Sequence, residues 1–340
     1  GLAAVIAGPV PAAQTALSLS RKAVSGAAQE EAASMTEAAP ESTGTAASQP
    51  EAAAPTGGIE SYLVELLGDD ARPEGAGAVI EKNYPQGSGE KYVACGAGSI
   101  KNNTRQTAAD IAAEIQEPLP FGVEKDSPDP QILIMHTHAS EAFTPAGRDL
   151  YPASDTCRTE DTNYNIVHVG DVLADTLASA GLQVLHDRTI YDYPSYTGSY
   201  NRSGAAVQEY LNQYPSLRIV IDLHRDALCS DSVVYKTVAE LPDTACSQVM
   251  LLVGTNASGL YHPYWEENLR LAVYLQDAVN AAHPTLMRPI TLVNERYNQH
   301  LTRGSLIIEV GSSGNTLREA IRAVRLFGES AGPALARLVQ

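Results

Sequence analysis

Three short apolar runs in the second half of the chain constrain its fold more than any other feature. Each has the length and composition of a buried strand, and they lie at residues 131–135, 218–223 and 306–310. Segments with a helical repeat of apolar residues lie between and after them, at residues 163–180, 204–214, 265–282 and 316–338. Strands that alternate with helices predict an α/β fold with a mostly parallel or mixed sheet, covered by helices on both faces. Further strands are expected at residues 183–185 and 248–253.

The first apolar run ends abruptly in polar residues, His136, His138 and Glu141. Polar side chains at the end of a buried strand need partners, and zinc can be that partner. A hydrolytic zinc site uses three protein ligands of the His, His, Glu type and keeps one position open. His138 and Glu141 form a His-x-x-Glu pair, so a third ligand must come from another strand.

The other two apolar runs supply the missing groups. The second run leads to His224, which we predict to be the third zinc ligand. The third run carries Glu309, which we predict to be the general base. Ligands of open α/β sheets bind beyond the carboxyl ends of strands, so these residues are expected to meet at one edge. His138 is favoured over His136 because the His-x-x-Glu spacing places both ligands on one turn. His136 is expected to orient a ligand or the substrate.

Several neighbouring residues keep two interpretations. Arg225 and Asp226 follow His224 and could hold substrate carboxylates or fix the loop, but a structural ion pair is equally compatible with the sequence. Four other histidines lack a carboxylate partner at useful spacing and are expected to be structural: His168, His186, His262 and His283. Cys229 and Cys246 could bridge across a hairpin or remain thiols.

Charge and composition exclude some classes of function. The formal net charge of −17 and the absence of a basic cluster argue against nucleic acid as a partner. The four cysteines show no CxxC spacing, which argues against a thiolate zinc site.

Composition also divides the chain. Residues 1–58 are predicted to form a disordered acidic spacer rich in Ala, Glu, Pro and Ser, with residues 1–17 as a candidate remnant of a membrane anchor. Residues 59–129 are expected to form a small lead-in segment packed on the main domain. Residues 130–340 are expected to form the catalytic domain.

Five motifs in order resemble the stage II sporulation protein P family of peptidoglycan hydrolases from endospore-forming bacteria. They span most of residues 99–338 and read Ile134-Met-His136-Thr-His138-Ala-Ser-Glu141, Ser199-Tyr-Asn-Arg-Ser203, Asp222-Leu-His224-Arg-Asp226, Tyr297-Asn-Gln-His-Leu301 and Ile308-Glu309-Val-Gly-Ser-Ser-Gly-Asn315. The family is similar to zinc-dependent N-acetylmuramoyl-L-alanine amidases, whose fold resembles that of zinc carboxypeptidases. The resemblance implies cleavage of the amide between the muramic acid lactyl group and the first alanine of the stem peptide. It also implies endopeptidase cleavage of peptide cross-links as a further activity.

The same resemblance implies a place of action. Family members are membrane-anchored outside the cytoplasm at the sporulation septum. They act in septal wall thinning and forespore engulfment beside stage II sporulation proteins D and M. Two alternatives remain at this point: a carboxypeptidase-like or endopeptidase-like zinc peptidase on wall peptides alone, and a catalytically inactive wall-binding scaffold.

One departure from the wider amidase pattern concerns the ligand glutamate. Those amidases take it from the start of the helix after the first strand, where this chain reads Glu160-Asp-Thr-Asn163 with no glutamate at the matching place. The resemblance therefore leaves Glu141 to serve in the manner of the carboxypeptidases. Glu160 is its rival.

Overall fold

The computed structural model describes residues 77–124, 127–144, 150–151, 157–229, 233–242 and 245–338. The predicted spacer, the candidate anchor remnant and the start of the lead-in segment lie outside the described residues. Among the helices that are described, none combines the length and the apolar character that a membrane crossing requires.

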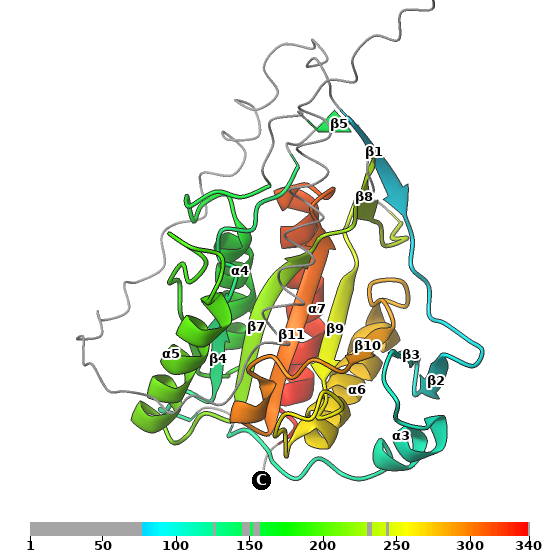
Figure 1. Ribbon diagram of the computed structural model, residues 1–340, viewed down its shortest axis with the longest axis vertical. Coiled ribbons are helices and arrows are strands. Elements are labelled where there is room, and N and C mark those ends of the chain that lie inside the picture. Colours follow the sequence, from blue (N-terminus) through cyan, green and yellow to red (C-terminus); the bar gives the residue numbers. More distant parts are fainter. Residues whose placement is uncertain are drawn as a thin grey trace, which may run out of the picture.

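An eight-stranded mixed sheet forms the centre of the molecule (Figure 1). Its strands follow in space as β2 (Tyr92–Cys95), β3 (Gly98–Asn102), β10 (Ile290–Val293), β9 (Val249–Gly254), β11 (Gly304–Ser312), β7 (Ile219–Asp226), β4 (Ile132–Met135) and β6 (Val184–His186). The four neighbours β11, β7, β4 and β6 are parallel, whereas β9 is antiparallel to β11. The predicted fold class is therefore confirmed.

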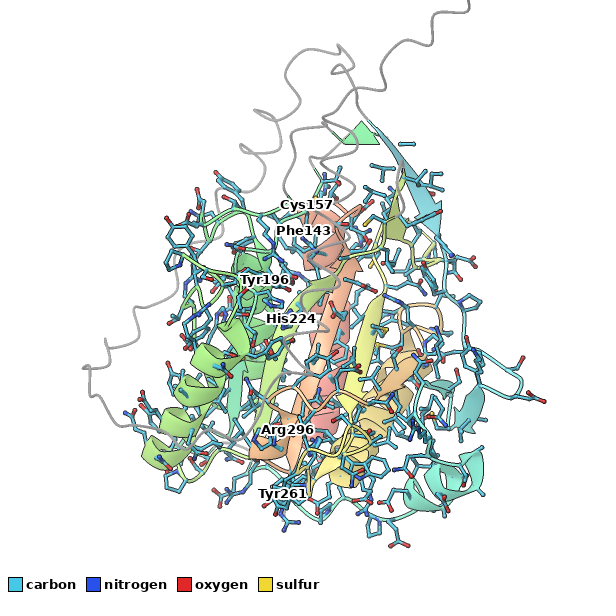
Figure 2. The ribbon with its side chains drawn as sticks, in the orientation of Figure 1. Phe143, Cys157, Tyr196, His224, Tyr261 and Arg296 are labelled. Carbon is cyan, nitrogen blue, oxygen red and sulfur yellow. The ribbon has the colours of Figure 1, made fainter. Side chains whose placement is uncertain are left out.

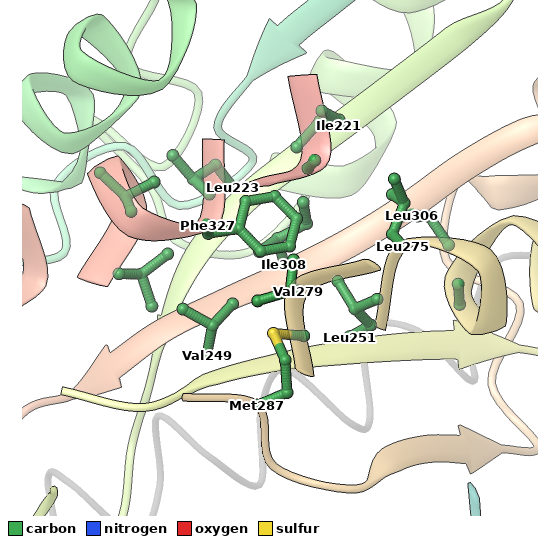
Figure 3. Packing of buried hydrophobic residues seen from close by; sticks show 14 of the residues in the cluster. Ile221, Leu223, Val249, Leu251, Leu275, Val279, Met287, Leu306, Ile308 and Phe327 are labelled. Carbon is green, nitrogen blue, oxygen red and sulfur yellow. The ribbon is translucent and has the colours of Figure 1, made fainter. Parts of the chain in front are cut away.

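Helices cover both faces of this sheet unequally. On one face α4 (Ile166–Ser179), α6 (Trp265–Ala282) and α7 (Leu317–Leu335) close a large core, in which Phe327 of α7 lies against the central strands (Figure 3). On the other face α5 (Ser199–Gln213) packs on β4 and β7 through a smaller apolar cluster that includes Val207. The short helix α3 (Ala108–Glu114) lies beside β2 at the far edge.

The period of two along each strand decides which side chains face α5. In β7, Ile219, Ile221 and Leu223 belong to the large core, and Val220 belongs to the cluster under α5. Asp222 and His224 alternate with the core residues, so they face the side of α5. Glu309 lies opposite His224 in the neighbouring strand. The sheet thus brings these polar side chains to one face.

The chain before and between the predicted elements contributes strands that the apolar runs did not indicate. β2, β3 and β10 complete one edge of the main sheet. β1 (Gly77–Lys82), β5 (Leu150–Tyr151) and β8 (Val233–Thr237) form a separate three-stranded sheet. The four cysteines are thiols, so the bridge between Cys229 and Cys246 that the sequence allowed is not formed.

Candidate metal centre

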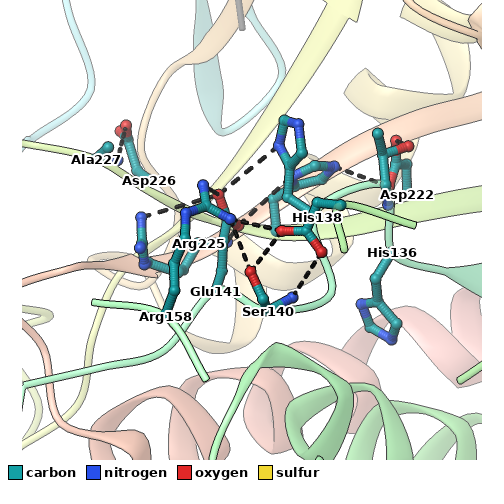
Figure 4. A network of polar contacts seen from close by, with 12 residues as sticks. His136, His138, Ser140, Glu141, Arg158, Asp222, Arg225, Asp226 and Ala227 are labelled. Carbon is teal, nitrogen blue, oxygen red and sulfur yellow. Dashed lines mark hydrogen bonds and ion pairs between the residues drawn. The ribbon is translucent and has the colours of Figure 1, made fainter. Parts of the chain in front are cut away.

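The end of β4 turns the chain so that a histidine and a carboxylate face the same point. After Met135 the chain leaves the sheet, and the backbone N–H of Glu141 donates to the carbonyl of His138 at 3.1 Å. The Glu141 carboxylate is then held from β7, because the backbone N–H of Arg225 donates to its Oε2 at 3.1 Å. Figure 4 shows this network around His138 and Glu141.

His138, Glu141 and His224 come together as the sequence predicted. Nδ1 of His138 lies 3.8 Å from Oε1 of Glu141, and Nδ1 of His224 lies 3.5 Å from Oε2. One ligand atom from each residue lies within 4.8 Å of the other two, and all three residues are buried. Tetrahedral zinc places its ligand atoms roughly 3.3 Å apart. The spacing and the chemistry of this donor set fit a zinc ion.

The electrostatics of the triad also suit a cation. Burial lowers the pKa of His138 to about 3, which leaves its imidazole neutral. Burial alone would raise the pKa of Glu141, but Arg225, His224 and His138 together hold it well below its usual range. Burial also opposes the charge on His224, yet the Asp222 and Glu141 carboxylates raise the pKa of His224 well above its ordinary value. A metal cation would take the place of this proton.

Asp222 supports His224, and it is a site residue that the sequence reasoning missed. Its Oδ1 lies 2.8 Å from Nε2 of His224. Thr137 fixes the same carboxylate, because its backbone N–H donates to Oδ1 at 2.8 Å and its hydroxyl donates to Oδ2 at 2.7 Å. A carboxylate on the far nitrogen of a metal-binding histidine sets its tautomer and orientation. The spacing of two residues from His224 was the available signal, since it places Asp222 on the same face of a strand.

Glu309 lies beside the triad without belonging to it. Glu309 of β11 lies directly opposite His224 of β7 in the register of the two strands. The Oε2 atom of Glu309 is buried without a hydrogen-bond partner. Burial and the nearby Asp226 carboxylate raise the pKa of Glu309 to about 8, although His224 opposes them. A carboxyl group with one unpaired oxygen and a pKa raised to about 8 has the properties of a general acid or base.

The raised pKa of Glu309 predicts how the stability of the metal-free protein depends on pH. The folded state holds a proton on Glu309 up to a pH of about 8, whereas an unfolded glutamate loses it near its ordinary value. The stability from this group is therefore present at low pH and is lost as the pH rises through about 8. Denaturant titrations in chelator between pH 5 and 9 should show a steeper loss in wild type than in Glu309→Gln. Parallel pH profiles of wild type and Glu309→Gln would contradict the raised pKa of Glu309.

His136 and Glu160 do not join the triad. The His136 ring points away from His138 (Figure 4) and is fully buried. Its Nδ1 lies 2.9 Å from the carbonyl oxygen of Leu223, and its Nε2 lies 2.8 Å from Nε2 of His186. Glu160 is exposed. The structure thus gathers the ligands first chosen from the sequence and neither rival.

Arg225 and Asp226 contact different parts of the molecule. Arg225 donates from Nε to the carbonyl of Ala142 and from Nη2 to the carbonyl of Cys157, each at 2.9 Å. Its Nη1 lies 3.9 Å from Oε1 of Glu141. Asp226 accepts from Arg288 at 2.7 Å. Arg225 therefore stabilises the loop that carries Glu141. Its positive charge also lowers the pKa of the Glu141 carboxyl group.

The expectation that His168 lacks a carboxylate partner at useful spacing is wrong, and His186 has a carboxylate partner from a distant segment. Nδ1 of His186 lies 3.0 Å from Oδ1 of Asp171, and Nδ1 of His168 lies 3.6 Å from Oδ2 of the same residue. Asp171 and His168 lie on α4, whereas His186 ends β6. Sequence spacing could not reveal the contact between His186 and Asp171, because it joins a strand to a helix, whereas His168 and Asp171 are three residues apart on α4.

Two tyrosines lie against the triad. The Tyr196 ring stacks on the His138 ring with centroids 4.6 Å apart, and Tyr200 meets His138 edge to face at 5.4 Å. Figure 2 shows Tyr196 and His224 in the same part of the molecule. Arg158 lies over the Tyr196 ring at 4.9 Å and approaches Glu141 to 3.7 Å. Aromatic rings and a guanidinium group thus border the candidate metal centre on the side of α5.

The chain is similar in sequence to one known protein family. The family described as Stage II sporulation protein P matches residues 74–330. The Stage II sporulation protein P of Bacillus subtilis (strain 168) is 27% identical over 203 residues, which cover 56% of this chain and 48% of that protein. The chain thus spans about half the length of this curated relative.

Two solved structures show low overall similarity. The N-acetylmuramoyl-L-alanine amidase of Clostridium difficile 630 has 14% identity and a TM-score of 0.33, and the match covers 62% of this chain and 95% of that one. The apo form of the N-acetylmuramyl-L-alanine amidase Ami1 of Mycobacterium abscessus has 12% identity and a TM-score of 0.36, with coverage of 62% and 99%.

Proposed function

The chain belongs to the stage II sporulation protein P family, and on this premise we propose that it is a zinc-dependent peptidoglycan hydrolase. The proposed reaction is hydrolysis of the amide between the muramic acid lactyl group and the first L-alanine of the stem peptide. One observation carries the proposal: the buried His138, Glu141 and His224 converge within 4.8 Å of one another. The carboxylate of Glu309, which lies opposite His224, completes the set of groups that amide hydrolysis needs.

The residues of the site divide the chemical work. A zinc ion held by His138, Glu141 and His224 would polarise the scissile carbonyl and make water more acidic. Glu309 removes a proton from the attacking water as its oxygen adds to the carbonyl carbon. The same carboxyl group then gives that proton to the leaving amine nitrogen as the C–N bond breaks. Asp222 holds the His224 ring in place throughout.

Place of action and partners are proposed from the family. We place the chain outside the cytoplasm, at the wall of the sporulation septum, with the membrane reached through an N-terminal anchor. Stage II sporulation proteins D and M are its proposed partners, and co-purification from sporulating cells tests this association.

A digest of defined muropeptides tests the reaction itself. The amidase reaction releases intact stem peptides that begin with a free L-alanine amine, and it leaves muramic acid with a free lactyl carboxylate. Mass spectrometry should detect both products when the purified protein is supplied with zinc. Products cut only within peptide cross-links would instead establish an endopeptidase. Absence of zinc and of any cleavage would favour a binding scaffold.

A further inference from the structure

β7 extends beyond the end of β4, and two side chains replace the missing strand. β4 ends at Met135, whose partner is Asp222, whereas β7 continues to Asp226. Beyond that point the carbonyl of Leu223 lies 2.9 Å from Nδ1 of His136, and the N–H of Arg225 donates to Glu141. Buried backbone groups require such partners. The peptide groups on either side of His224 are therefore held by side chains.

The second nitrogen of His136 leads to helix α4. A carbonyl can only accept a hydrogen bond, so His136 carries its proton on Nδ1 and its Nε2 is an acceptor. Nε2 of His186 lies 2.8 Å from this acceptor, so it must donate. Nδ1 of His186 lies 3.0 Å from Oδ1 of Asp171, which holds the ring from its other side. Polar contacts thus run from α4 through His186 and His136 to the backbone of β7.

Gly170 shows that α4 is shaped around this contact. A Cβ atom at Gly170 would lie 2.6 Å from Nε2 of both His136 and His186. Glycine within a helix is destabilising relative to alanine, so its presence needs a reason. The imidazole pair gives a physical reason for glycine here, because any larger residue would force the two rings to move. Asp171, the next residue of the helix, supplies the carboxylate.

We propose that Asp171, His186 and His136 form a positioning relay that fixes the backbone of β7 at His224 and thereby sets the metal affinity of the site. The relay orients the Cα–Cβ bond of His224 from the large-core side of the sheet, whereas Asp222 orients its ring from the other side. These are positioning residues, since none of them touches the metal position. Their effect on affinity rests on the proposed zinc site, but their effect on the β7 backbone does not.

The test compares zinc affinity, by competition with a chelator, among wild type and variants whose folding is checked by denaturant titration. His186→Leu removes the donor and should weaken zinc binding by roughly 10–100-fold. His186→Gln keeps an N–H donor and should recover most of the affinity. His168→Leu is the matched control, because His168 also lies near Asp171, at 3.6 Å, and should bind zinc as wild type does. The visible spectrum of the cobalt-substituted protein should change in His186→Leu alone.

A second readout uses the metal-free protein. Amide hydrogen exchange at Arg225 should be at least about tenfold faster in His186→Leu than in wild type, because the backbone beside His224 is less restrained. If His186→Leu folds poorly, Gly170→Ala replaces it in this measurement. It should likewise speed amide exchange at Arg225. Unchanged exchange and unchanged zinc affinity in a folded variant would overturn the relay. Failure of wild type to bind zinc, together with faster exchange in the variant, would overturn the proposed zinc chemistry and leave the relay standing.

Discussion

Replacing Glu309 by glutamine is expected to lower the rate of stem-peptide release by about 10²–10⁴-fold while zinc stays bound, which is the usual loss on removal of a general base. Glutamine has nearly the shape of glutamate but cannot accept a proton at neutral pH. Glu309 lies opposite His224 and has an unpaired, buried Oε2, so the neutral amide should fit in the same place. Release of stem peptides from purified sacculi and zinc content by elemental analysis are the two measurements.

Glu329→Gln is the matched control for this prediction. Glu329 is exposed on α7, which covers the opposite face of the sheet, so the same chemical change should leave both activity and zinc content unaltered. Persistent release by Glu309→Gln would remove Glu309 from the reaction. Loss of zinc from that variant would instead make Glu309 a ligand.

The sequence predicted the central strands and the helices because their signals are local. The helix at residues 265–282 matches α6 at both ends, and the three apolar runs coincide with β4, β7 and β11. The ends of these strands were less predictable. β7 continues through His224 to Asp226, because β11 remains its partner after β4 has ended. His224 and Glu309 therefore lie within strands and not just beyond them.

The choice between His136 and His138 shows how far residue spacing alone can identify a metal ligand. The preference for His138 rested on its spacing from Glu141, and the structure brings those two residues together. The physical reason lies in the end of β4. Up to Met135 the strand has a period of two, which directs His136 toward the large core with Ile134. The turn that follows breaks this period and lets His138 reach the opposite face.

Other parts of the site depend on contacts between distant segments. The role of Asp171 comes from the packing of α4 beside β6, and its partner His186 is the last residue of that strand. The sequence prediction missed β10, although this strand joins β9 to β3 in the sheet. Neither result follows from local periodicity, since each depends on which segments become neighbours in space.

The second large effect is expected from Glu141→Gln, which should weaken zinc binding by more than about 100-fold, since changing a group that only supports a ligand already costs 10–100-fold. Glu141 faces Nδ1 of both histidines, at 3.8 Å and 3.5 Å. Glutamine can still accept the N–H of Arg225, so the loop should remain in place, but it cannot offer zinc an anionic oxygen. Chelator competition measures the affinity, and stem-peptide release should fall with it.

Glu160→Gln separates the two carboxylates that the sequence left as rivals for this role. Glu160 is exposed and lies outside the triad, so this variant should keep wild-type zinc affinity and activity. Both substitutions change a carboxylate to an amide. Both residues lie in the segment of the chain that follows β4. A loss of zinc in Glu160→Gln, with zinc retained in Glu141→Gln, would transfer the ligand role to Glu160. It would also require residues 157–165 to move toward His138, because the buried position beside Nδ1 of both histidines is now filled by Glu141.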